Sequence, residues 1–282
     1  MEMTAAKAVR LTRAALEAAG VENAGFDARQ LVAAALETPA GRLPLVLGEE
    51  ISPAAQRSLD RMTADRAGGR PLQYILGSWE FYGLPFAVGE GVLIPRPETE
   101  LLVDVGLEFL KSRPEGEVID LCSGSGCIAV AVARHAPAAR VTAIELQPEA
   151  YRFTVRNIGL NHCYTVQAEQ GDLFDGPGGK TADLILSNPP YIRAGDLAAL
   201  QREVEREPQT ALDGGADGLR FYRAIAALWS GALRPGGCLA VEVGFDQAAA
   251  VAELFSAAGL EKIETRRDLS GIERVVLARK NG

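Results

Sequence analysis

The chain has 282 residues, a formal net charge of −8, 48% hydrophobic residues and 23% charged residues. These proportions are typical of a globular protein with ample material for a core, and the acidic balance argues against a large basic footprint for DNA or RNA. No apolar run approaches the roughly 18 residues that span a bilayer, and the N-terminal stretch lacks the apolar block of a signal peptide. We therefore expect a cytoplasmic, monomeric protein without membrane or direct nucleic-acid contact.

The cysteines and histidines do not form a recognisable metal-binding pattern. There are four cysteines and two histidines, and no two cysteines have CxxC spacing. A zinc site or a disulfide framework is therefore not expected. Buried, reduced thiols are expected instead, at Cys122, Cys127, Cys163 and Cys238.

The first part of the chain, residues 1–70, is alanine-rich and reads as helical. Leu11, Ala15 and Ala18 are expected to mark the packed face of the first helix. Ser52 followed by Pro53 fits an N-cap with proline at the first helical position, and that helix is expected to end at 68–69, where two glycines stand. A small helical domain results, with no visible site chemistry.

The rest of the chain is expected to form a β-hairpin linker over residues 71–95 and an α/β domain over residues 96–282. Aromatic and β-branched residues alternate in the linker around two glycines. Beyond it, strands and helices alternate, which indicates a mainly parallel sheet covered by helices on both faces. The last two strands are close in sequence, which suggests an antiparallel hairpin. The expected strands are 117–121, 140–146, 164–169, 182–187, 238–244, 262–268 and 273–280.

A glycine loop follows the first of these strands. Gly124 and Gly126 allow a tight turn and close approach to a ligand, and ligands of open α/β sheets bind outside the carboxyl ends of the strands. Glu145, at the end of the next strand, can bind both hydroxyls of a ribose. This pattern alone leaves NAD and S-adenosylmethionine open. Asp120 suits the ammonium of a methionine moiety better than a pyrophosphate, and Asp172 is placed to reach an adenine amino group.

The fourth strand ends at Asn188-Pro189-Pro190-Tyr191. The Asn188 side-chain oxygen and the Pro189 carbonyl can each accept one hydrogen of a planar amino group, which would orient its nitrogen toward a cofactor. Tyr191 could stack on a flat substrate, and the prolines stiffen the corner. The charged run that follows, 202–207, is expected to be a solvated helix face, or else the edge of a lid beside this corner.

Four separated stretches extend this corner into a family resemblance. They are RPLQYILG (70–77), LIPRPETE (93–100), DLCSGSGCIAVAVA (120–133) and LRPGGCLAVEVGFDQ (233–247). With the Asn-Pro-Pro-Tyr corner, the chain resembles the bacterial release factor glutamine methyltransferases. The resemblance implies a class I, Rossmann-like methyltransferase domain with a seven-stranded sheet. It also implies S-adenosylmethionine as donor, S-adenosylhomocysteine as product, and N5 of the glutamine in the Gly-Gly-Gln motif of class I peptide chain release factors as acceptor.

The same resemblance implies roles for particular residues, and a role in substrate-protein recognition for residues 1–70. Catalytic roles fall to Asn188, Pro189 and Tyr191. The implied cofactor-binding residues are Asp120, Cys122, Ser123, Gly124, Ser125, Gly126, Glu145, Asp172, Leu173 and Asn188. The implied substrate-binding residues are Arg96, Asn188, Pro189, Pro190 and Tyr191. Cys122 and Ser123 stand where many relatives have Gly-Thr, and cysteine adopts positive φ less readily than glycine.

Other functions remain open on the sequence. A glutamine of a ribosomal protein would need the same chemistry. An adenine-N6 DNA methyltransferase shares the Asn-Pro-Pro-Tyr motif, but the negative net charge and the absence of a long target-recognition insertion disfavour it. A module that binds the cofactor without catalysis would have no need of amide acceptors, and an NAD enzyme would leave the corner without a role.

Overall fold

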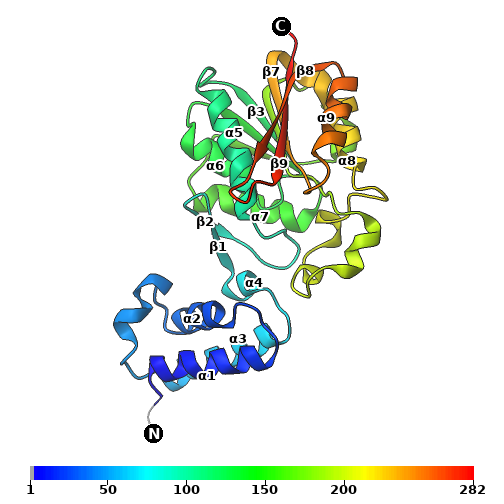
Figure 1. Cartoon of the computed structure of the whole chain (residues 1–282). Coiled ribbons are helices and arrows are strands. Elements are labelled where there is room, and N and C mark those ends of the chain that lie inside the picture. The colour runs from blue at the N-terminus through cyan, green and yellow to red at the C-terminus, as the bar shows by residue number, and fades with distance from the viewer. Residues whose placement is uncertain (1–2) are drawn as a thin grey trace. The chain divides into compact units, whose positions relative to one another are not determined.

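The computed structural model describes residues 3–282, and the first two residues of the expected N-terminal domain lie outside this range. The chain divides into two compact units (Figure 1). The first comprises the chain up to Gly77 together with Gln201–Arg206. The second comprises Ser78–Leu200 and Glu207–Gly282, so the β-hairpin belongs to the second unit.

The first unit is a small helical domain, as residues 1–70 indicate. Ser52 Oγ accepts a hydrogen bond from the backbone N–H of Ala55 at 3.1 Å, and the capped helix ends just before Gly68. Both the predicted N-cap and the predicted helix end are therefore confirmed. The helices are α1 (Ala5–Ala18), α2 (Ala24–Ala35), α3 (Pro53–Ala67) and α4 (Leu72–Leu76).

The prediction of which face of α1 is packed was wrong. Leu11, Ala15 and Ala18 are exposed, whereas the buried side chains of α1 are Ala5, Ala8, Thr12 and Leu16. Alanine occurs on every side of this helix, so the apolar period does not single out one stripe. The position of Leu16, and not that of Leu11, then decides which side faces the other helices.

The expectation that 202–207 forms a solvated helix face was only partly right: Arg202, Glu205 and Arg206 are exposed, but Glu203 and Glu207 are held by other side chains. Within the first unit, the guanidinium of Arg66 donates to Asp27 at 2.6 Å and to Glu203 at 2.8 Å. Arg66 and Asp27 are both buried, and Glu207 at the end of the run is only 4% exposed. These acidic side chains are therefore held by ion pairs and hydrogen bonds, since a buried charge is stable only when paired.

The second unit is built on a seven-stranded sheet with the strand order β5-β4-β3-β6-β7-β9-β8. Strands β3 to β7 run parallel, and β9 pairs antiparallel with both β7 and β8. The predicted parallel sheet with a terminal antiparallel hairpin is thus confirmed. The strands are β1 (Ser78–Phe81), β2 (Leu84–Ala87), β3 (Glu117–Leu121), β4 (Arg140–Glu145), β5 (Val166–Gln170), β6 (Ala182–Ser187), β7 (Leu233–Glu242), β8 (Leu260–Arg267) and β9 (Glu273–Lys280). The helices are α5 (Glu100–Leu110), α6 (Cys127–His135), α7 (Pro148–Leu160), α8 (Arg220–Ala224) and α9 (Ala248–Ala257).

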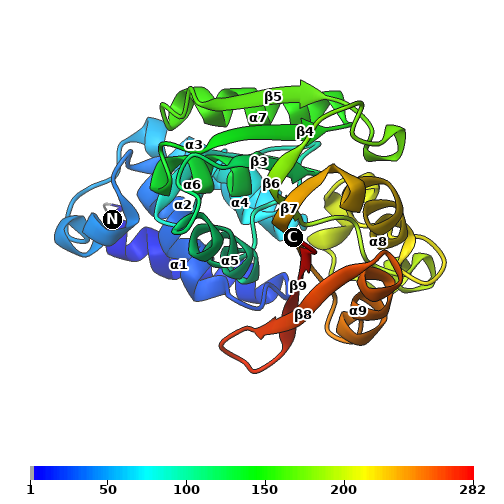
Figure 2. The same ribbon diagram turned by 90° about the horizontal axis from the view of Figure 1, so that it is seen from above.

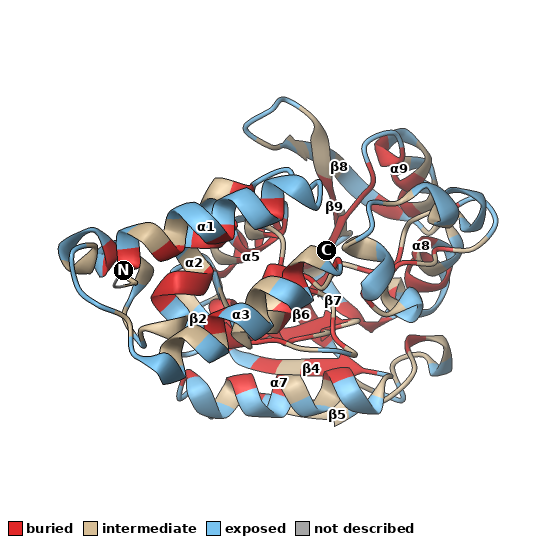
Figure 3. Ribbon diagram, turned by 90° about the horizontal axis from the view of Figure 1, so that it is seen from below, coloured by how far each residue is buried: buried red, intermediate tan, exposed pale blue. Residues whose placement is uncertain are grey.

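The sheet is apolar on both faces, because successive side chains of a strand point to opposite sides. Leu184 and Leu186 of β6 belong to the core under α5 and α6, whereas Ile185 belongs to the core under α8 and α9. Viewed from above, α5, α6 and α7 lie on one side of the sheet and α8 and α9 on the other (Figure 2). All six residues of β6 are buried (Figure 3), as a parallel sheet covered on both faces requires.

The strand order also fixes where a ligand can bind. Strand β3 lies between β4 and β6. The chain runs from β3 outward to β4 and β5 along the sheet, and then returns to place β6 and β7 on the other side of β3. This reversal opens a crevice at the carboxyl ends of these strands. The glycine loop, Glu145 and Asn188 all follow or end these three strands.

Candidate active site

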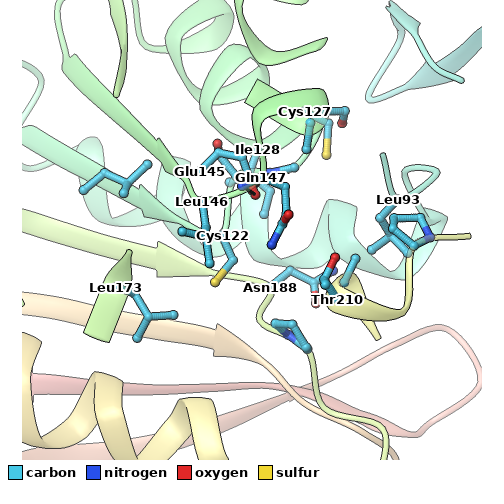
Figure 4. A pocket seen from close by; sticks show the side chains of 18 of the residues that line it. Leu93, Cys122, Cys127, Ile128, Glu145, Leu146, Gln147, Leu173, Asn188 and Thr210 are labelled. Carbon is cyan, nitrogen blue, oxygen red and sulfur yellow. Dashed lines mark hydrogen bonds between the residues drawn. The ribbon is translucent and has the colours of Figure 1, made fainter. Parts of the chain in front are cut away.

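A pocket that is partly open to solvent lies at this edge of the sheet. Its walls come from the ends of β3, β4, β5 and β6, from the segment before α5, and from residues 208–211. Figure 4 shows Leu173 at one end, Glu145, Gln147 and Cys122 in the middle, and Asn188 beside Thr210 toward the other end. The walls are apolar with a few polar groups among them, as is typical of a small-molecule site.

Asp120, in β3, is fully buried behind the pocket. Its Oδ2 accepts a hydrogen bond from the backbone N–H of Ala129 at 3.1 Å, whereas Oδ1 has no hydrogen-bond partner among residues 3–282. Burial, with a contribution from the negative charge of Glu145, raises the pKa of Asp120 to about 8. The carboxyl is therefore protonated at neutral pH unless a cation approaches it.

The loop between β3 and α6 holds three residues with positive φ. Gly124 has φ +57° and Gly126 has φ +77°. A Cβ at Gly126 would lie 3.0 Å from the Thr154 methyl group, whereas a Cβ at Gly124 would meet little but open space. Cys122 also has positive φ, at +57°, so this side chain is tolerated in the left-handed region. The loop therefore keeps its course with cysteine at this position, and burial raises the pKa of the Cys122 thiol.

Glu145 ends β4 with its carboxylate fixed by backbone amides. Oε2 accepts from Gly124 N and Oε1 accepts from Gln147 N, each at 2.8 Å. Burial raises the pKa of Glu145, and these backbone hydrogen bonds oppose the rise. Since each carboxylate oxygen has a second lone pair, both can still accept a hydrogen bond from a diol in the pocket.

The connection after β5 forms the far wall of the pocket. Asp172 caps a short 3₁₀ turn by accepting a hydrogen bond from Phe174 N at 2.9 Å. The Leu173 side chain is buried, and the Leu173 carbonyl accepts from the indole N–H of Trp229 at 2.8 Å. Leu173 is thereby held in place as an apolar surface for a flat group.

The Asn188 corner is oriented by a hydroxyl from another segment. Ser187 Oγ donates to the Leu121 carbonyl at 2.8 Å, which ties the ends of β6 and β3 together. Asn188 Nδ2 donates to Thr99 Oγ1 at 3.1 Å. Because the amide nitrogen is engaged in this way, Asn188 Oδ1 is left as an acceptor at the pocket wall.

Tyr191 lies behind the pocket wall. Its ring packs with the apolar cluster under α8 and α9, and the Tyr191 carbonyl accepts from Gln247 Nε2 at 2.9 Å. Gly214 and Gly218 leave the space that this backbone needs, because a Cβ at Gly218 would lie 2.5 Å from the Tyr191 carbonyl oxygen. Burial raises the pKa of the Tyr191 phenol. In this arrangement Tyr191 braces the corner.

Arg96 lines the other side of the pocket and forms an ion pair with Glu207. The second oxygen of Glu207 accepts from the backbone N–H of Ile94 at 2.9 Å. Burial raises the pKa of Glu207, and Arg96 opposes the rise. Glu207 thus fastens the segment before α5 to the segment that contributes Pro208 and Thr210 to the pocket.

The structure brings most of the proposed site residues into one pocket. Those that line it are Arg96, Cys122, Ser123, Gly124, Ser125, Glu145, Asp172, Leu173, Asn188 and Pro190. Asp120, Gly126, Pro189 and Tyr191 are not among the lining residues.

Sequence reasoning missed three polar residues at the site: Thr99, Glu207 and Glu242. Only Glu242 carried a usable signal, as a lone acidic residue inside the apolar stretch CLAVEVG. Thr99 sits in the LIPRPETE stretch, and its partner Asn188 lies far along the chain.

Among residues 3–282, no cluster of three or more histidine, cysteine, aspartate or glutamate side chains could hold a metal ion. In the same range, no helix is long and apolar enough to cross a membrane.

Comparison with known proteins matches both units. The PrmC N-terminal domain family matches residues 7–77, and the methyltransferase small domain family matches residues 98–216. The chain is 44% identical to a release factor glutamine methyltransferase of Geobacter sulfurreducens, with 97% of this chain and 95% of that protein aligned. It is 41% identical to the Cereibacter sphaeroides protein of the same name, over 98% of this chain and 99% of that one.

Among solved structures, a methyltransferase from Pyrococcus furiosus has a TM-score of 0.51 at 17% identity. The match covers 72% of this chain and 91% of that chain, and it supports the fold alone. The sequence matches establish the family as well as the fold, since they run nearly from end to end at identities above 40% and agree with a methyltransferase-like sheet and pocket. The chain is therefore an enzyme and belongs to the release factor glutamine methyltransferase family.

Proposed function

We propose that this enzyme transfers a methyl group from S-adenosylmethionine to the side-chain nitrogen N5 of the glutamine in the Gly-Gly-Gln motif of class I peptide chain release factors. The observation that carries the proposal is the orientation of Asn188. Its Nδ2 donates to Thr99, which leaves Oδ1 as an acceptor at the pocket wall. A primary amide offers two N–H groups, and it needs such acceptors to be held with its nitrogen facing a methyl donor.

The residues around the pocket fit the methyl donor. Asp120 Oδ1 and Ser123 Oγ are buried polar atoms without a hydrogen-bond partner among residues 3–282. Asp120 Oδ1 can accept a hydrogen bond from the ammonium group of the methyl donor. The Glu145 carboxylate can take the ribose hydroxyls, and Leu173 offers an apolar surface to adenine, with Asp172 beside it. When bound, S-adenosylmethionine supplies an electrophilic methyl group on a sulfonium and departs as S-adenosylhomocysteine.

The acceptor residues supply orientation and electrostatic support. Asn188 Oδ1 and the Pro189 carbonyl accept the two N–H hydrogens of the glutamine amide, which favours nitrogen lone-pair density directed at the methyl group. As the new C–N bond forms, the nitrogen becomes positive, and these same oxygens stabilise that charge. The methylated nitrogen then loses one proton to water, so no strong base is needed before attack. Pro190 stiffens the corner, and Tyr191 braces it from behind.

We propose further that the N-terminal helical domain recognises the body of the release factor, and that the enzyme works as a cytoplasmic monomer. The first unit matches a domain family of its own and exposes large apolar side chains. Leu45 is 82% exposed, and Leu11 and Phe26 are exposed as well. Exposed apolar side chains mark protein contacts where they gather into a patch.

The direct test is mass spectrometry after incubation of the enzyme with S-adenosylmethionine and a purified, unmethylated class I release factor. A gain of one methyl group on the Gly-Gly-Gln glutamine, absent with Asn188→Ala, is the expected result. A ribosomal protein is the next substrate to assay, since its glutamine would need the same chemistry. Methylation there, with none on the release factor, would overturn the proposed acceptor.

A further inference from the structure

Glu242 is a buried acidic residue for which the chemistry above has no use. It is the last residue of β7 and is 2% exposed, and its Oε2 has no hydrogen-bond partner among residues 3–282. A carboxyl group at such a place opposes folding unless something stabilises it. Groups of this kind beside a pocket are candidates for a functional role.

The surroundings of Glu242 connect it to the acceptor corner. Burial raises the pKa of Glu242 to about 7, and the neighbouring side chains of Thr99, Arg274 and Tyr191 oppose the rise. Thr99 is itself 2% exposed, and its Oγ1 is the atom that accepts from Asn188 Nδ2. The other ionisable groups that face Glu242 are Arg274 of β9, Glu98 beside Thr99, Tyr222 of α8 and Cys127 of α6.

We propose that Glu242 is a positioning residue that acts through Thr99 to hold the Asn188 side-chain oxygen toward the substrate amide. The proposal rests on the function proposed above, because it assigns the purpose of the orientation to amide binding. The orientation of the Asn188 side chain is a property of this chain alone, so it can be tested without substrate.

The reasoning follows from the hydrogen-bond capacity of a hydroxyl. Thr99 has one hydroxyl proton to donate. When that proton is given to the Glu242 carboxylate, Thr99 Oγ1 can only accept from Asn188, so the amide must present Nδ2 to Thr99 and Oδ1 to the pocket. When Glu242 is protonated, it can donate to Thr99 instead. The Thr99 proton is then free to turn toward Asn188 and stabilise the reversed amide, which presents N–H groups to the substrate.

The kinetic test compares four proteins: wild type, Glu242→Gln, Thr99→Val and Thr99→Ser. In wild type, kcat is expected to fall as the pH drops below about 7, the pKa to which burial raises Glu242. Glu242→Gln keeps an acceptor but cannot titrate, so it should lose this acid limb. Thr99→Val keeps the shape without the hydroxyl and should lower kcat by about tenfold to a hundredfold, as misplacement of a reacting group does. Thr99→Ser restores the hydroxyl and should recover most of that loss, with the KM for S-adenosylmethionine little changed in all four.

A purely structural role would give a different pattern. Thr99→Val and Thr99→Ser would then have equal kcat, or the acid limb would persist in Glu242→Gln. Either result would overturn the proposal.

A second measurement is independent of any methyl transfer. In the enzyme alone, the Asn188 side-chain NH₂ resonances, identified by their loss in Asn188→Ala, should shift with a midpoint near pH 7 in wild type and remain fixed in Glu242→Gln. Asn188 resonances that change neither with pH nor in Glu242→Gln would refute the positioning role of Glu242, even if the release factor is methylated. Conversely, a titrating Asn188 in an enzyme that leaves the release factor unmodified would keep the positioning role and refute the proposed acceptor.

Discussion

Replacement of Gly126 by alanine tests how the loop between β3 and α6 keeps its shape. Gly126 has φ +77°, and an added Cβ would lie 3.0 Å from Thr154 Cγ2 and 3.3 Å from Thr154 Cα. The left-handed backbone alone costs a non-glycine residue about 1–2 kcal/mol, and overpacking adds about 1–3 kcal/mol. The lower entropy of the unfolded alanine chain offsets about 0.4–1 kcal/mol. We expect Gly126→Ala to lower the free energy of unfolding by about 2–4 kcal/mol.

Gly124→Ala is the matched control. Gly124 has φ +57°, but its Cβ would meet only the Cys122 carbonyl oxygen, at 4.0 Å. Its loss of stability should therefore reflect the backbone term alone, at about 1 kcal/mol. The assay is urea unfolding at fixed pH, with the slope against denaturant checked for each variant.

A second substitution isolates the steric term. Thr154→Ser removes the methyl group that meets the new Cβ, and it retains the hydroxyl that donates to the Gly124 carbonyl at 2.8 Å. In the Gly126→Ala background it should recover about 1 kcal/mol or more, seen as a non-additive double-mutant cycle. Equal losses for the two glycine variants, or strict additivity with Thr154→Ser, would refute the reasoning.

Three further predictions concern charge and recognition. At pH 7, binding of S-adenosylmethionine should release about 0.9 more proton from wild type than from Asp120→Asn, because a carboxyl with a pKa of about 8 is mostly protonated at this pH until a cation binds. Calorimetry in buffers of different ionisation enthalpy measures the number of protons released. Equal release from both proteins would contradict the prediction. Arg66→Met leaves its buried acidic partner unpaired and should destabilise the first unit by about 3–5 kcal/mol, whereas Arg13→Met breaks an exposed pair and should change stability by less than about 0.5 kcal/mol. Leu45→Ser should raise the KM for an intact release factor but not for a short Gly-Gly-Gln peptide. The control is Tyr164→Ser, which changes a similarly exposed apolar residue of the second unit. Equal effects of the two changes would contradict recognition by the helical domain.

Local patterns were enough to predict the sheet, the glycine loop and Glu145. A run of buried strand residues, a glycine turn and a helix are contiguous in the chain, and the carboxyl ends of parallel strands necessarily meet at one edge. The positions of Gly124 and Gly126 could therefore be predicted from the sequence. The tolerance of positive φ at Cys122 could not, because it depends on how the surrounding loop is held.

Tertiary structure decided the features that depend on distant residues or on competing faces. The buried side of α1 could not be read from a helix with alanine all around it, and packing selected Leu16 over Leu11. The ion pair of Glu207 with Arg96 joins the end of a charged run to a residue that lines the pocket. Likewise Asn188 carries the amide chemistry by its residue type alone, but its direction is set by Thr99, which lies 89 residues earlier in the chain. The sequence by itself thus determined which groups are present at the edge of the sheet. Only the fold determined how they are oriented, because hydrogen-bond direction depends on neighbours that local pattern does not specify.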